Sequence, residues 1–191
     1  MAINLSKNTT ISLTKEVDKL SNIKVGLGWD VAKAKGLFAS FFGSDSIDLD
    51  ASCLLIDKDK QVIDTIWYRQ LRSKCRSVHH QGDNRTGEGE GDDETISINL
   101  NKLPSSVKYI AITVNSFTGQ SFENVRNAFC RVRDQSSKEV CRYTLTEQGD
   151  HTGIFIGLLS YDNQEWHFTS KGVTTSGNSV KQLEATVINH I

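Results

Sequence analysis

The chain lacks the features that mark several specialised classes of protein. No apolar run approaches the roughly 20 residues of a membrane-spanning helix. Met1–Lys15 has no hydrophobic stretch typical of a signal peptide. The 22 basic and 23 acidic residues nearly cancel, so charge gives no reason to expect specific nucleic-acid binding. We therefore expect a cytoplasmic protein.

The four cysteines form no C-x-x-C pair, which argues against a structural zinc site. Three of them lie in apolar-periodic stretches and are expected to be buried and, in a cytoplasmic chain, reduced. The fourth, Cys75, lies among three cations, which would favour its thiolate form and leave a reactive-thiol role open. The first three are Cys53, Cys130 and Cys141, and the cations are Arg72, Lys74 and Arg76.

Alternating apolar and polar residues dominate the chain and predict β-strands. The clearest case is Thr95–Asn101, where Ile96, Ile98 and Leu100 would face a core. Many short strands at roughly regular spacing indicate an all-β fold, a two-sheet antiparallel β-sandwich. The other strand-like runs are Thr9–Leu13, Ile23–Leu27, Ile47–Ile56, Gln61–Tyr68, Tyr109–Val114, Ala128–Arg133, Val140–Leu145, Ile154–Leu159 and Glu165–Thr169.

Two segments depart from this pattern and predict short helices. Apolar residues recur at helical spacing only in the C-terminal segment, about Ser179–Ile191, and Phe122–Asn127 fits a single short turn. No linker or low-complexity segment interrupts the 191 residues, a length that suits a single domain over 1–191.

The segment Gly82–Glu94 carries the strongest chemical signal. It contains six carboxylates opposed by Arg85 alone, and four glycines interrupt it. Two carboxylates held at about 4 Å repel by roughly 4 kcal/mol at an effective dielectric near 20, so such a segment stays extended or binds a cation. Calcium takes 6–8 oxygen ligands of this kind. A merely solvated acidic loop is the alternative.

Three further aspartates strengthen the case for a cation site. Asp30 ends a strand-like run, and Asp48 and Asp50 flank Leu49 at the start of another. Residues two apart on a strand share a face, so both carboxylates project the same way while Leu49 faces the other side. If these strand ends meet the segment Gly82–Glu94, they form an oxygen-rich basin at one end of the sandwich; a plain exposed strand face is the alternative.

Other metal sites fit the sequence poorly. Counted from Asp83, an EF-hand would need glycine at position 6, where Glu88 stands. Zinc would need clustered sulfur and nitrogen ligands. His79 and His80 are adjacent, so on a strand they would face opposite sides and could not share a metal.

Three strings resemble the TerD family of tellurium-resistance and stress proteins, and the last of them is long and specific. The resemblance covers nearly the whole chain, and Val114–Gln120 is similar to one type within that family. The three strings are Gly26–Asp30, Asp48–Ser52 and Gly82–Glu94, and weaker matches are Leu5–Lys7, Ser12–Lys15 and Phe129–Val132.

The resemblance implies a β-sandwich that binds calcium, usually two ions, and no established enzymatic activity. It also implies resistance to tellurite, phage and colicins within a membrane-associated assembly. Other tellurium-resistance proteins or a membrane-bound complex would be the partners. Because calcium takes only 6–8 oxygens, some residues of the implied set cannot bind the ion directly. These residues must support the ones that do or face the solvent. The set, carried over by motif, is Asp30, Asp48, Asp50, Asp83, Asn84, Glu88, Glu90, Asp92, Asp93 and Glu94.

Compared with shorter family members, the chain carries an insertion, Ala32–Ser44, between two of the implied ligands. It holds four large apolar residues beside two lysines. These residues either fold back onto the core or form an exposed apolar tip, which would give calcium-dependent peripheral contact at the inner face of the cytoplasmic membrane. The apolar residues are Leu37, Phe38, Phe41 and Phe42, and the lysines are Lys33 and Lys35.

Three classes of function remain to be compared. A calcium-dependent binding module accounts for the acidic segment, the paired aspartates and the insertion together. A hydrolase could use paired carboxylates as acid and base, but no nucleophile-elbow or Ser/His/Asp arrangement accompanies them. Direct tellurite chemistry at thiols would need better exposed cysteines than these. We therefore expect a binding protein and not an enzyme.

Overall fold

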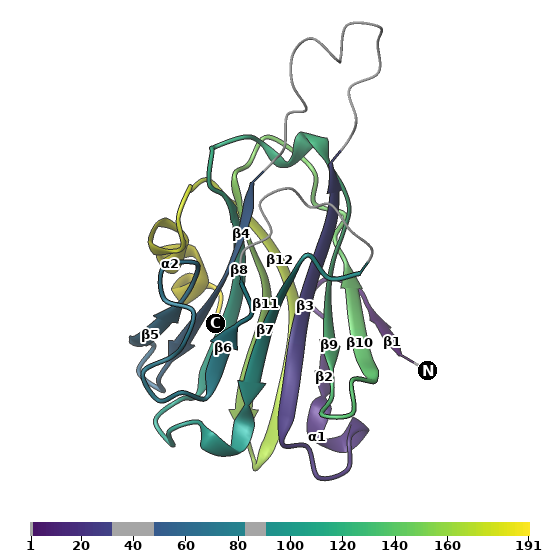
Figure 1. Ribbon diagram of the computed structural model, residues 1–191, viewed down its shortest axis with the longest axis vertical. Helices are drawn as coiled ribbons and strands as arrows, with labels where there is room; N and C mark the ends of the chain where they lie inside the picture. Colours follow the sequence, from purple (N-terminus) through teal and green to yellow (C-terminus); the bar gives the residue numbers. More distant parts are fainter. Residues whose placement is uncertain (1, 32–47, 83–90) are drawn as a thin grey trace, which may run out of the picture.

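Two six-stranded sheets pack face to face in the computed structural model, which describes residues 2–31, 48–82 and 91–191 (Figure 1). Sheet A has the strand order β1-β10-β9-β3-β7-β6 and sheet B the order β2-β12-β11-β8-β4-β5. Sheet A comprises β1 (Ile3–Leu5), β3 (Asn22–Val31), β6 (Val78–His80), β7 (Glu94–Asn99), β9 (Val125–Arg133) and β10 (Glu139–Thr144). Sheet B comprises β2 (Thr10–Ser12), β4 (Leu49–Ile56), β5 (Val62–Ile66), β8 (Tyr109–Ser116), β11 (Gly153–Asp162) and β12 (Glu165–Thr175).

The main core lies between the two sheets and follows the alternation of the sequence. Ile96 and Ile98 of β7 are buried there, while the residues between them are partly exposed. A second apolar cluster forms on the outer face of sheet B, where helix α2 (Val180–Asn189) packs through Val180 and Val187. Strand β4 is buried on both faces as a result, with Leu55 in the main core and Leu54 under α2.

Most of the expected elements are present. All ten predicted strands occur, and α2 fills the predicted C-terminal helix. The predicted turn at Phe122–Asn127 contains a 3-10 helix, η3 (Phe122–Asn124). Within the described ranges, no helix is long and apolar enough to cross a membrane.

Four short elements were not predicted, and one pairing differs from the expected antiparallel pattern. One of the four, the 3-10 helix η2 (Leu100–Lys102), takes the last two residues of the predicted strand Thr95–Asn101, because the Asn99 side chain accepts from the Lys102 amide and caps it. Strands β1 and β6 have three residues each, too few for alternation to be recognised. Helix α1 (Leu13–Glu16) follows β2 because the hydroxyl of Ser12 accepts a hydrogen bond from the Lys15 amide at 3.3 Å and caps it. Strand β1 pairs in parallel with β10.

Candidate metal-binding end of the sandwich

Three acidic segments, distant in sequence, lie in the half of the sandwich where β3 ends and β4 starts. These are the end of β3, the start of β4 and the residues that enter β7, which lie opposite Leu27 and below the tip of β3 in Figure 1. The amide of Asp93 donates to the Leu27 carbonyl at 2.8 Å, and its carboxylate accepts from the Trp29 amide at 2.8 Å. The C-terminal part of the acidic segment therefore contacts β3 near its end, and the oxygen-rich basin stays a prediction.

Glu94 and His80 of sheet A both contact the backbone of a single residue of β4, Ala51. The pairing of β5 with β4 starts at Cys53, so Ala51 lies beyond the end of β5. The Glu94 carboxylate accepts a hydrogen bond from the Ala51 amide at 2.6 Å, and His80 Nε2 lies 3.2 Å from the Ala51 carbonyl. Since the Gly82 amide donates to His80 Nδ1, Nε2 carries the proton and donates to that carbonyl.

Asp48 and Asp50 stand at the start of β4, in different degrees of burial. Asp50 is 5% exposed and pairs across the sheet with Asn115, on the face that Leu54 occupies further along β4. Leu49 lies in the main core, on the other face, as predicted. Asp48 is partly buried, and its carbonyl accepts from the Phe117 amide at 2.9 Å. Burying an ionised carboxylate is costly unless charge or hydrogen bonds compensate it.

Asp92 is held by two arginines from the neighbouring strand β9. Its carboxylate, 4% exposed, accepts from Arg131 Nε at 2.6 Å and also pairs with Arg133. The carboxylate lies over Gly26, where any Cβ would collide with it. Both oxygens are therefore engaged by cations of this chain, which assigns Asp92 a role in anchoring the acidic segment.

Asp30 lies on the exposed end of β3 and accepts a hydrogen bond from the Asn127 side chain at 2.7 Å. Burial raises the pKa of Asp93, and the negative charges of Asp30 and Asp92 raise it further, while the Trp29 amide opposes the shift. Like charges are thus crowded at this end, and a bound cation would relieve their repulsion.

The described ligands do not complete a metal site by themselves. Among the residues with described positions, no three His, Cys, Asp or Glu side chains are grouped closely enough to hold a metal ion. The donors that are present are carboxylate oxygens, which suit calcium in kind. Four of the implied ligands, Asp83, Asn84, Glu88 and Glu90, lie outside the described residues, as do Leu37, Phe38, Phe41 and Phe42.

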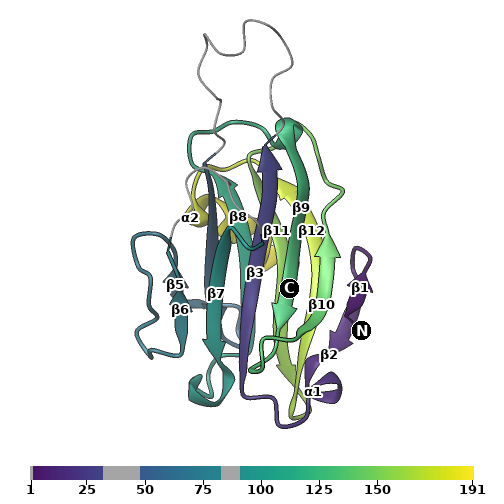
Figure 2. The ribbon, with the colours of Figure 1, turned by 45° about the vertical axis from the view of Figure 1, so that its right-hand side comes forward.

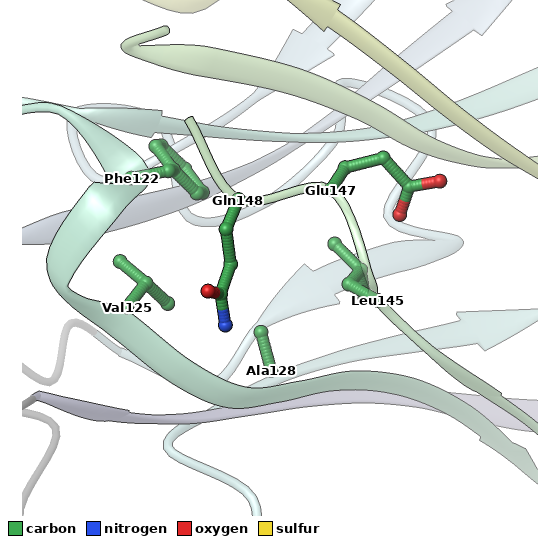
Figure 3. A pocket seen from close by; sticks show the side chains of 6 residues that line it. All are labelled: Phe122, Val125, Ala128, Leu145, Glu147 and Gln148. Carbon is green, nitrogen blue, oxygen red and sulfur yellow. The ribbon is translucent and has the colours of Figure 1, made fainter. Parts of the chain in front are cut away.

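A small cavity at the same end is not a ligand pocket. Its volume of about 10 Å³ is near the minimum for one water molecule. Figure 3 shows Phe122 and Gln148 beside it and Glu147 turned to one side. Glu147 accepts hydrogen bonds from the Tyr143 hydroxyl at 2.9 Å and pairs with Lys7 at 3.3 Å. This carboxylate is structural and gives no acid–base pair.

The positions of the cysteines and histidines confirm the predictions made for them, but the cause of the lowered pKa of Cys75 differs from the expected one. Cys53, Cys130 and Cys141 are buried and reduced, and the two adjacent histidines face opposite sides of β6. Burial raises the pKa of Cys75, but hydrogen bonds with Ser73 and Ser77 lower it by more. The neighbouring cations, to which the sequence analysis attributed a lowered pKa, are not its cause.

A family model described as "TerD domain" matches residues 1–185 of the chain. The chain belongs to the TerD family. It is 53% identical to the tellurium resistance protein TerZ of Serratia marcescens, over 99% of this chain and 98% of that protein. It is 40% identical to the TerD protein of the same organism, over 93% of each chain. The stress response protein SCP2 of Bacillus subtilis is 36% identical over 96% of this chain and 98% of its own length.

The fold has also been observed in a more distant relative. A crystal structure of a TerD homologue from Streptomyces coelicolor covers 86% of this TerD-family chain and 95% of its own, with a TM-score of 0.70 and 16% identity. The type within the family that Val114–Gln120 resembles is the TerZ type, which agrees with the 53% identity to TerZ.

Proposed function

We propose that this TerD-family protein binds calcium, as two neighbouring ions, and acts as a binding module in resistance to tellurium and in the stress response. The observation that carries the proposal is the crowding of Asp30, Asp92 and Asp93, whose charges add to burial in raising the pKa of Asp93. Glu94, the next residue, is buried and accepts a hydrogen bond from Ala51, which follows buried Asp50 in β4. A divalent cation would compensate this charge.

The roles of the residues follow from their contacts. Asp50 and Glu94 are buried carboxylates of sheet B and sheet A, and both belong to the ligand set that the family resemblance implies. Asp93 is held at its position by Trp29 and Leu27. Asp92 would not contact the metal directly, since both of its carboxylate oxygens already contact arginine, and it would instead hold the acidic segment in place. Asp83, Asn84, Glu88 and Glu90 would supply the remaining oxygens.

Calcium should bind far more tightly than magnesium. Magnesium demands octahedral geometry at about 2.0–2.1 Å and releases its water reluctantly, whereas a set of many carboxylates suits the larger ion. The measurement is a calorimetric titration with calcium, alone and in competition with magnesium. Equal affinity for the two ions would contradict this site.

The same titration separates the binding module from the thiol hypothesis. Blocking the thiols with an alkylating reagent should leave calcium binding unchanged, because Cys75 lies in the segment before β6 and bonds only with Ser73 and Ser77 among the described side chains. Loss of binding after alkylation would favour a thiol-based function. We propose no enzymatic activity. A carboxylate-dependent hydrolase is the second candidate, and only the abundance of carboxylates favours it.

We further propose that calcium promotes attachment to a membrane or to a membrane-bound complex of other tellurium-resistance proteins. The ends of the insertion Ala32–Ser44 are set by β3 and β4, whose aspartates belong to the proposed site. Burying a large apolar side chain contributes roughly 1.5–3 kcal/mol, and a lysine near an anionic surface about 1 kcal/mol. Phe41 and Phe42 would be the anchors.

A double variant, Phe41→Ser with Phe42→Ser, should therefore lose calcium-dependent sedimentation with membranes. Wild type should move from the membrane fraction to the soluble fraction when a chelator is added, while the variant should stay soluble in both conditions. Thermal melts must show that the variant is folded. If the folded variant fractionates like wild type under both conditions, the insertion is not a membrane contact.

A further inference from the structure

The outer face of sheet A carries a row of basic residues that the calcium proposal does not use. The register places Lys24 directly opposite Arg133 of β9 on one side and Ser97 of β7 on the other. Ser97 in turn lies opposite His79 of β6, and Arg72 forms a bridge with His79. Figure 2 shows β3, β7 and β9 side by side in this sheet.

A groove of about 370 Å³ lies along this row, and we call it the basic groove. Its size falls within the range of small-molecule sites, roughly 300–1,000 Å³. Cations and neutral hydrogen-bonding groups line it together. The cationic or titratable groups are Lys24, Arg76 and His79, and the neutral polar ones are Asn22, Ser77, Ser97, Asn99 and Gln135.

The one carboxylate in its lining is already satisfied. Asp134 is 7% exposed, and its Oδ1 accepts hydrogen bonds from the amides of Ser136 and Lys138 and from the Ser136 hydroxyl. Although burial opposes the shift, these hydrogen bonds lower the pKa of Asp134, so its negative charge partly offsets the cations of the groove.

The two cations that line the groove, Lys24 and Arg76, form no ion pair among the described residues, and neither does Arg72, which bridges to His79. Arg133, which lies opposite Lys24, pairs with Asp92. Burial lowers the pKa of His79, and the charges of Arg72 and His80 lower it further. An anion in the groove would pair with Lys24 and Arg76.

We propose that the basic groove binds a small molecule that carries a phosphate group. Arginine and lysine both bind phosphate, arginine through paired N–H groups, and a dianion matches Lys24 and Arg76 better than a single carboxylate does. Ser77, Ser97 and the amide side chains would bind the hydroxyl or ring groups of the rest of the ligand. The site lies on the outer face of sheet A and shares no residue with the proposed calcium ligands.

The test is a titration of the full chain with inorganic phosphate and with adenosine monophosphate, followed by amide chemical shifts. A chelator is present throughout, so that phosphate cannot report on calcium. Saturable binding should shift amides near Lys24, Arg76 and Ser97. Adenosine monophosphate should bind more tightly than inorganic phosphate, because it fills more of the groove.

Lys24→Gln and Arg76→Gln should each weaken binding by about tenfold, the effect of losing one charge-assisted hydrogen bond. Both side chains are exposed, so both variants should fold. Lys181→Gln, an exposed lysine on α2 against the other sheet, is the matched control and should bind like wild type.

Equal weakening by all three variants would reduce the effect to general charge and overturn the proposal. Absence of saturable binding to either probe would overturn it as well. Asp50→Asn should bind both probes like wild type, so the calcium proposal and this one can fail separately.

Discussion

Replacing Asp92 by asparagine is expected to lower the free energy of unfolding by about 2–4 kcal/mol. Removing one partner of a buried ion pair typically costs about 3–5 kcal/mol because a charge is left without compensation, and asparagine keeps part of the hydrogen bonding. Here the side chain of Asp92 is 4% exposed, and it pairs with Arg131 and Arg133, which are 19% and 24% exposed. Urea unfolding of wild type and variant would measure the change.

Asp59→Asn is the matched control for this substitution. Asp59 pairs with Lys58 at 2.8 Å, but its side chain is 66% exposed, and surface pairs contribute roughly 0–1 kcal/mol. A loss of stability at Asp92 no larger than that at Asp59 would show that the arginines do not anchor the acidic segment.

Gly26 offers an independent check on the same anchor. A methyl group at Gly26 would collide with the Asp92 carboxylate, so Gly26→Ala should be strongly destabilising in wild type. In an Asp92→Ala background the obstruction is gone, and the same substitution should cost much less. If the two substitutions instead lower the stability additively, the destabilisation by Gly26→Ala does not come from a collision with Asp92.

The sequence specified the strands better than it specified the contacts of the site. Ten strands could be predicted because the strand-like runs that contain them span five or more residues, as in β7, where Ile96 and Ile98 face the core. The approach of Asp93 to the end of β3, where Asp30 lies, agrees with the interpretation that strand ends and the acidic segment meet, while a shared ligand site with Asp50 stays a prediction.

Pairings between distant residues could not be predicted from the sequence. Asp92 meets Arg131 and Arg133 across 39 and 41 residues, and Glu94 meets Ala51 across 43. Such pairs depend on the register of β3, β7 and β9, which alternation alone does not fix. Gly26 is the one signal that was present, because a glycine within a strand often marks close approach by another group.

The two histidines of β6 illustrate the same limit, because the sequence predicted which way they face but not which residues they contact. Adjacency predicted correctly that His79 and His80 face opposite sides. It did not predict that His80 completes the bonding of Ala51 beside Glu94, or that His79 lies in a row with Lys24 and Arg133. Both roles arise from the order of strands in sheet A, in which β3 and β7 separate β6 from β9.

Saturating calcium is expected to raise the Tm of the protein by roughly 5–10 °C. A ligand that binds only the folded state at a hundredfold excess over its Kd adds about 2.7 kcal/mol, and 1 kcal/mol corresponds to about 2–4 °C for a domain of this size. Repulsion among Asp30, Asp92 and Asp93, which raises the pKa of Asp93, should be relieved by the ion. Thermal melts in calcium and in chelator would measure the shift.

Asp50→Asn should reduce that calcium-dependent shift by half or more, because it removes one carboxylate charge from a position that is 5% exposed. The comparison rests on the difference between melts in calcium and in chelator, so any change that the substitution makes to the metal-free fold cancels. Asp59→Asn, on the turn between β4 and β5, should keep the full shift. A full shift in Asp50→Asn would remove Asp50 from the ligand set, and no shift in wild type would mean that the acidic segment is merely solvated.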